Sequence, residues 1–143
     1  MSTFLLIHGA LRGAWLWEKV ISKLRSNGVD VSAVDLPGHG MRSSEDRRGM
    51  TMSSYITDVG GFIRRENLKD LILVGHSMSG MVISKLAEEM PERVKHLCYL
   101  AAVVPKGDEA LIDLLPPARQ AALKALWGKT TEIFGPIESL KPA

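Results

Sequence analysis

The chain holds only one cysteine, Cys98, so no disulfide can form within it. It also lacks an apolar run of the roughly 18 residues that a transmembrane helix needs, and it lacks the cationic start and cleavage pattern of a signal peptide. Basic residues are scattered, and the formal net charge of +2 is too small to indicate a nucleic-acid surface. We therefore expect a cytoplasmic protein that binds neither nucleic acid nor a membrane.

The remaining composition indicates a single globular domain. The length of 143 residues suits one domain, and 45% apolar with 24% charged residues is typical of soluble proteins. There is no internal repeat and no low-complexity segment. Cys98 lies within an apolar run, which predicts a small buried side chain rather than a reactive thiol.

Apolar runs that are typical of buried strands alternate with amphipathic segments that are typical of helices. The predicted strands cover residues 3–7, 29–36, 71–74 and 94–104, and the helices between them cover residues 14–27, 53–66 and 78–90. This alternation predicts an α/β fold in which a parallel sheet of about four strands is flanked by helices. Beyond Pro105 the pattern predicts two further helices, over residues 109–115 and 118–127, and no further strand.

Two of the predicted helices carry features that packing must explain. The first places four apolar residues at helical spacing, which predicts one core-facing side: Trp17, Val20, Ile21 and Leu24. The second contains Gly60-Gly61. Each glycine destabilises a helix by about 1 kcal/mol relative to alanine, unless close packing requires it.

The clearest chemical signal is LILVGHSMSG at residues 71–80. An apolar run ends at a glycine, a serine follows two residues later, and a helix pattern then begins. A strand, a sharp turn and a helix in this order expose a hydroxyl at the apex of the turn, so Ser77 is the candidate nucleophile. The backbone N–H of Met78 would lie at a helix N-terminus, where positive potential favours an anion. In the usual motif, G-x-S-x-G, a glycine stands where this chain has Ser79, and here Gly80 follows one place later; an ordinary strand–helix connection is the alternative.

Three segments together resemble the N-terminal half of an α/β-hydrolase: HGALRGAWLW at residues 8–17, DLPGHG at 35–40 and GHSMSG at 75–80. The order and spacing of the segments are most similar to the branch of plant methylesterases and hydroxynitrile lyases and its bacterial relatives. The resemblance runs from about residue 3 to residue 104.

This resemblance implies roles for particular residues. Ser77 would be the nucleophile, and the N–H groups of Ala10 and Met78 would form the oxyanion hole. Residues 1–104 would form the hydrolase core and residues 105–143 part of a helical cap. Relatives in this branch cleave small esters or cyanohydrins without a metal or organic cofactor, so we expect none here.

The acid and the base of a catalytic triad are not found. In the family they follow the cap, in the order serine, acid, histidine. The sequence ends at Ala143, inside the predicted cap, so neither residue is assigned. Asp35 ends the second predicted strand, and we expect it to anchor the following turn rather than to assist catalysis.

Four histidines are present, and none is a convincing base. His76 adjoins Ser77, but neighbours on a strand point to opposite faces, so its ring should point away from the site. We expect His8 to shape the loop after the first strand through hydrogen bonds. His39 lies at the carboxyl end of a strand and is the best of the four, although a turn-forming role is favoured. His96 lies at the amino end of its strand, far from the site.

These features predict a carboxylesterase-like serine hydrolase that acts on small esters through an acyl-enzyme on Ser77, or the nucleophile-bearing part of one. A binding or interaction module that keeps the hydrolase pocket is an alternative, because the acid and base are missing. Hydroxynitrile lyase activity is another alternative, since it would use the same turn.

The strand order of the family is second, first, third, fourth, and it places residues 94–104 at an edge of the sheet. An uncovered edge strand presents unpaired main-chain groups that can pair with another chain. Besides a small ester as substrate, we therefore expect a second copy as partner, in a homo-oligomer formed through this edge.

Overall fold

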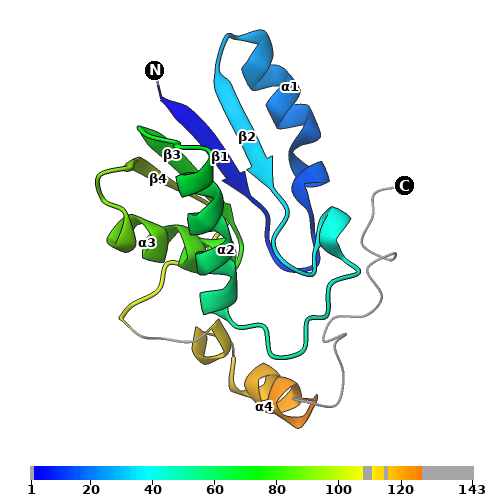
Figure 1. The fold of residues 1–143 in the computed structure, drawn as a ribbon. Helices are drawn as coiled ribbons and strands as arrows, with labels where there is room; N and C mark the ends of the chain where they lie inside the picture. The colour runs from blue at the N-terminus through cyan, green and yellow to red at the C-terminus, as the bar shows by residue number, and fades with distance from the viewer. Residues whose placement is uncertain (1, 108–110, 115, 127–143) are drawn as a thin grey trace.

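Four parallel strands form the sheet of the computed structural model: β1 (Thr3–Ile7), β2 (Asp30–Val34), β3 (Leu71–His76) and β4 (Val94–Leu100). Their order is β2-β1-β3-β4, as predicted, and the predicted α/β class is confirmed (Figure 1). The structure describes residues 2–107, 111–114 and 116–126.

Two strands are shorter than predicted, for local reasons. β2 ends at Val34, and the backbone N–H of Leu36 donates to Nε2 of His8 at 3.0 Å instead of to a strand. β4 ends at Leu100, because Ala101 has a φ of 45° and turns the chain out of the extended conformation.

Helices cover both faces of the sheet (Figure 1). η1 (Ala14–Trp17) and α1 (Glu18–Ser26) pack on one face, and α2 (Met52–Arg65) and α3 (Ser79–Glu89) pack on the other. Successive side chains of a strand point to opposite faces, so each strand contributes to two cores. In β1, for example, Leu5 and Ile7 join the core under α2 and α3, whereas Leu6 joins the core under α1.

The structure explains most of the helix features. Val20 is an exception to the predicted core face, since it is 42% exposed. The segment starts with the tighter 3-10 turn η1, so the helical spacing counted from Trp17 is shifted along α1. Gly60 packs closely, because a Cβ there would lie 2.9 Å from Cε of Met90, the end of a flexible side chain, whereas a Cβ at Gly61 would meet nothing within 4 Å.

β4 has one covered and one bare face. Leu97 and Tyr99 pack against the core under α2 and α3, but His96, Cys98 and Leu100, on the other face, are exposed. The prediction of a buried Cys98 is therefore wrong. The core under α1 includes no residue of β4, so the apolar run there does not imply burial on both faces.

Beyond β4 the chain forms η3 (Leu111–Leu114) and α4 (Pro117–Leu126). α4 begins at the second proline of the predicted break, where the missing N–H of a proline is tolerated. Residues 108–110, 115 and 127–143 of the predicted cap lie outside the described residues, so the boundary at residue 104 stays a prediction. Within the described ranges, no helix has the length and apolar character that a membrane crossing requires.

Candidate active site

The turn between β3 and α3 carries Ser77. Its φ of 55° lies in the left-handed region, which is strained for a residue with a side chain and which recurs at functional turns. The turn is tight, because a Cβ at Gly75 would lie 2.7 Å from the carbonyl oxygen of Ser79. The Ser77 carbonyl accepts hydrogen bonds from the N–H groups of Val103, at 2.9 Å, and Gly80, at 3.2 Å. Two main-chain hydrogen bonds to its carbonyl thus hold Ser77 in this conformation.

Ser79 explains the departure from the usual motif. Its side chain is fully buried, and its hydroxyl donates a hydrogen bond to the carbonyl of His8. A glycine at this position could not make that link between α3 and the loop after β1. The glycine one place later is also required, since a Cβ at Gly80 would collide with the carbonyl of Val103.

The loop after β1 approaches Ser77 closely. A Cβ at Gly9 would lie 2.8 Å from Cβ of Ser77 and 2.9 Å from Nδ1 of His76, so only glycine fits. Leu11 has a φ of 59°, which turns the loop back. Ala10 lies between these two residues. The predicted oxyanion loop is therefore beside the candidate nucleophile.

Two main-chain amides, next to Gly9 and Ser77 in the sequence, have no protein partner in the described part of the chain. Among the described residues, the N–H groups of Ala10 and Met78 donate to no other protein group. The Met78 side chain is only 6% exposed and packs in the core under α2 and α3, which fixes the position of its amide. Such preorganised donors stabilise the negative oxygen that develops when a hydroxyl attacks a carbonyl group.

His8 has a structural role, as predicted. Its ring is fully buried, its Nδ1 donates to the Gly9 carbonyl at 2.7 Å, and its Nε2 accepts from the Leu36 N–H. Burial lowers the pKa of His8 to about 4. Both ring nitrogens are occupied, so a neutral His8 holds the loop that approaches Ser77.

The other histidines do not reach Ser77 either. His39 donates from Nδ1 to the carbonyl of Pro37 at 2.9 Å, which is the expected turn-forming bond, and burial lowers its pKa. Burial and the nearby charge of Arg12 lower the pKa of His76. The His76 ring meets Trp17 edge-on, with centroids 6.5 Å apart, on the face of the sheet under α1.

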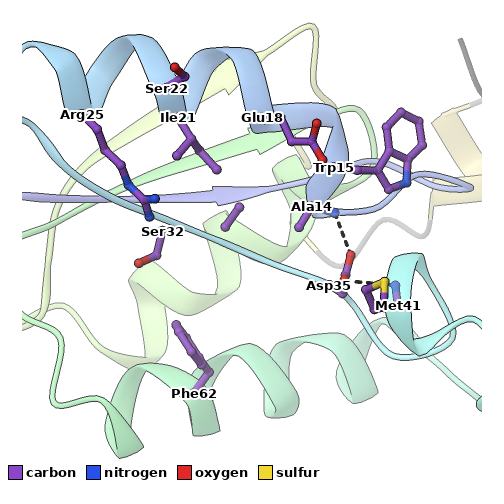
Figure 2. A pocket seen from close by; sticks show the side chains of 11 residues that line it. Ala14, Trp15, Glu18, Ile21, Ser22, Arg25, Ser32, Asp35, Met41 and Phe62 are labelled. Atoms are coloured by element: carbon purple, nitrogen blue, oxygen red, sulfur yellow. Dashed lines mark hydrogen bonds between the residues drawn. The ribbon is translucent and has the colours of Figure 1, made fainter.

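Asp35 anchors two turns, as predicted from its position. Its carboxylate accepts hydrogen bonds from the N–H groups of Ala14, at 2.6 Å, and Met41, at 3.1 Å (Figure 2). A Cβ at Gly40 would collide with the same carboxylate. Both oxygens are thus engaged in fixing the loops after β1 and β2.

A groove of about 830 Å³ lies elsewhere, along β2 between α1 and α2 (Figure 2). Residues that line it include Trp15, Arg25, Ala33, Asp35 and Phe62, but not Ser77 or either oxyanion amide. Two of its charged groups already have protein partners: Asp35 binds the two amides above, and Arg25 donates to the Val31 carbonyl at 3.1 Å. The groove is separate from the candidate active site.

The structure brings the loop with Ala10 close to the turn with Ser77, but it places no base there among the described residues. Among the described residues, the Ser77 hydroxyl has no hydrogen-bond partner, and no group of three His, Cys, Asp or Glu side chains could hold a metal ion. Sequence reasoning missed the bond from Val103 to the Ser77 carbonyl. No sequence signal points to it, because Val103 lies past the end of β4 and acts through its main chain.

Comparisons with known proteins identify a family and several similar chains. The profile described as the Alpha/beta hydrolase family matches residues 4–141. The chain is 39% identical over 118 residues to a carbendazim hydrolyzing esterase from a Nocardioides species, over 82% of this chain and 49% of that protein. It is 34% identical over 117 residues to methylesterase 10 from Arabidopsis thaliana, over 80% of this chain and 40% of that protein.

Solved structures give the same result. The fold superposes with a TM-score of 0.81 and 30% identity on an extracellular alpha/beta-hydrolase from a Paenibacillus species, over 88% of this chain and 51% of that chain. That protein is described as sharing structural and functional homology with tobacco Salicylic Acid Binding Protein 2. The chain thus spans about half the length of these relatives or less.

Proposed function

Because the chain belongs to the alpha/beta hydrolase family and its relatives include esterases, we propose that it carries the nucleophile half of a carboxylesterase-like serine hydrolase. The predicted resemblance to this family and to its methylesterases is confirmed. The observation that carries the proposal is the contact between the loop and the turn: Gly9 lies against Ser77, and the next amide along each segment, that of Ala10 and that of Met78, has no protein partner among the described residues.

The proposed reaction starts at the Ser77 hydroxyl. Its oxygen attacks the carbonyl carbon of a small ester, and the carbonyl oxygen takes the negative charge beside the amides of Ala10 and Met78. Collapse of this intermediate expels the alcohol, which takes up the proton that the serine loses, and leaves an acyl-enzyme. Water then attacks the acyl group and releases the acid, with the proton returning to Ser77.

This chain should catalyse slowly by itself. Both steps need a base that accepts and returns a proton, and the described residues place none at Ser77. Serine proteases that lack triad members still accelerate hydrolysis by about 10³-fold through the oxyanion hole and binding alone. We therefore expect acylation to be detectable and turnover to be weak.

A fluorophosphonate probe tests the nucleophile. The chain should be labelled once, and Ser77→Ala should abolish labelling. Ser22→Ala, which removes an exposed hydroxyl on α1, should leave labelling unchanged and serves as the matched control. Labelling that persists in folded Ser77→Ala would refute the proposal.

A binding module is the second candidate, because Ser77 has no base among the described residues. Calorimetry with a small ester, followed by analysis for the released acid, separates the two functions. Binding without acyl-enzyme or product favours the module. Hydroxynitrile lyase activity stays a prediction, and benzaldehyde release from mandelonitrile is its test.

The substrate class and location are also proposals. A small uncharged ester suits the proposed chemistry, and the relatives named above include esterases and a methylesterase. The expected cytoplasmic location stays a prediction, since the similar Paenibacillus protein is extracellular. Fractionation of the producing cells would decide the location.

A further inference from the structure

The His76 ring carries a buried nitrogen without a partner. Among the described residues, its Nδ1 is covered by protein, yet it makes no hydrogen bond. A buried polar atom of this kind costs stability, and most such atoms in folded proteins are paired. This one belongs to the residue before Ser77, next to the candidate active site.

The nitrogen lies against the loop after β1. A Cβ at Gly9 would lie 2.9 Å from Nδ1 of His76 and 3.2 Å from the His76 carbonyl oxygen. Since Gly9 has no Cβ, a hydrogen on its Cα occupies this direction and faces the nitrogen. The ring therefore limits how Gly9, and with it the next residue, Ala10, can approach Ser77.

The same segment also encloses the ring from its other end. Trp17 is only 3% exposed and meets the His76 ring edge-on, with centroids 6.5 Å apart and planes at 88°. Aromatic rings at this separation and angle attract each other. A rotation of the ring away from Gly9 would disturb the contact with Trp17, which belongs to the core under α1.

The protonation state of the ring decides whether the contact with Gly9 holds. A nitrogen that carries only a lone pair tolerates a C–H group as its neighbour, whereas an N–H there would be a buried donor without an acceptor. A neutral histidine can keep its proton on Nε2, but a protonated one carries a proton on both nitrogens. Protonation of His76 would therefore place an N–H against Gly9.

We propose that neutral His76, with its proton on Nε2, positions the loop after β1, and that protonation of the ring moves the Ala10 amide away from Ser77. This inference rests on the proposed function, because Ala10 supplies one of the two candidate oxyanion amides. The charged and titratable groups beside the ring are Arg12 and His8, both on the side of this loop. Burial and then the charge of Arg12 lower the pKa of His76 from its ordinary 6.5, so the ring is neutral at neutral pH.

NMR tests the inference without any reaction. In the neutral ring, the proton of His76 should be found on Nε2. As the pH is lowered from about 8 to the onset of acid unfolding, the Ala10 amide resonance should shift with the same midpoint as the His76 ring. His76→Asn keeps an acceptor near the position of Nδ1 but does not titrate, so this shift should vanish. His96→Asn, at an exposed position of β4, is the matched control and should leave the shift in place.

The rate of fluorophosphonate labelling at Ser77 gives a second readout. At a pH of about 8, His76→Ala should label at least about tenfold more slowly than the parent chain, and His76→Asn should recover most of the rate. Below the midpoint of the His76 titration, the parent should lose at least about tenfold relative to His76→Asn. The ratio of the two rates removes the pH dependence of the serine itself, which both chains share.

Three results would overturn the proposal. One is a neutral His76 with its proton on Nδ1. Another is an Ala10 amide that does not follow the His76 titration, or a ring that stays neutral until the chain unfolds. The third is a labelling rate that depends on pH equally in the parent and in His76→Asn.

Failure of the proposed function would look different. A parent chain that is not labelled at Ser77 at any pH would refute the nucleophile. The NMR titration of Ala10 would still decide whether His76 positions the loop.

Discussion

The turn around Ser77 is closely packed, whereas one face of β4, the strand beside it, is exposed. At and beside the turn, the three glycines Gly9, Gly75 and Gly80 have no room for a Cβ, and the Ser77 carbonyl is bonded to the N–H of Val103, far along the chain. On β4, the neighbour of β3, alternate side chains meet solvent. The candidate nucleophile and the two candidate oxyanion amides lie on β1, β3 and α3 and the turns that join them, and the N–H of Val103 supports them from beyond β4.

The largest expected effect is a loss of stability in acid, because His8, which holds the loop beside the turn, resists protonation in the folded chain. Its pKa of about 4 in the folded chain lies below the ordinary 6.5, so the folded state resists protonation. Stability from this group is complete above pH 6.5 and is lost as the pH falls to about 4. By linkage the loss is about 3 kcal/mol in the free energy of unfolding.

Urea unfolding at a series of pH values measures this loss. His8→Gln should show a shallower profile, whereas His96→Gln, an exposed site on β4, should match the parent chain. If the free energy of unfolding depended on pH equally in His8→Gln and in the parent chain, His8 would not be the group that holds the turn region.

Gly9→Ala should have the next largest effect, because the new Cβ would lie 2.8 Å from that of Ser77. Forcing the loop away costs about 1–3 kcal/mol of stability and displaces the Ala10 amide. Fluorophosphonate labelling should slow at least tenfold, even where the protein remains folded by circular dichroism. Normal labelling would mean that the loop is not part of the site.

Ser79→Ala should destabilise the chain by about 1–3 kcal/mol, since it leaves the His8 carbonyl buried without its partner. Labelling of Ser77 should persist, at a reduced rate. Ser53→Ala, at an exposed position on α2, is the control and should shift the unfolding midpoint little. Equal stability of the two variants would contradict the buried bond.

The smallest expected effect tests whether the room for a Cβ at a glycine predicts the effect of an alanine there, as was assumed for Gly9. Gly61→Ala meets nothing within 4 Å and should stabilise α2 by about 1 kcal/mol. Gly60→Ala, one residue earlier, should gain less or lose stability because of Met90. Calorimetry should give a higher melting temperature for Gly61→Ala than for Gly60→Ala. A higher melting temperature for Gly60→Ala would contradict the use of Cβ distances to predict these effects.

The sequence predicted the parts of the molecule that depend on local pattern. β1 has its predicted bounds, and the serine lies on the strand–turn–helix that its motif indicates. The end of β4 could not be predicted, because a left-handed residue at Ala101 has no signature in an apolar run. The exposure of Cys98 could not be predicted either, because burial of a strand on both faces depends on elements packed from elsewhere in the chain.

Some features of the candidate site could likewise be predicted from the sequence, and others could not. The types and spacing of residues sufficed to place Ser77, Met78 and the loop with Ala10. The bond from Ser79 to His8 and the bond from Val103 to Ser77 arise between segments distant in sequence. Long-range main-chain partners of this kind leave no periodic signal.

A crystal structure of the fluorophosphonate adduct tests the central claim most directly. The adduct should be bonded to Oγ of Ser77, with its phosphoryl oxygen about 2.7–3.1 Å from the backbone nitrogens of both Ala10 and Met78. A phosphoryl oxygen that points to solvent, or an adduct on another residue, would contradict the account.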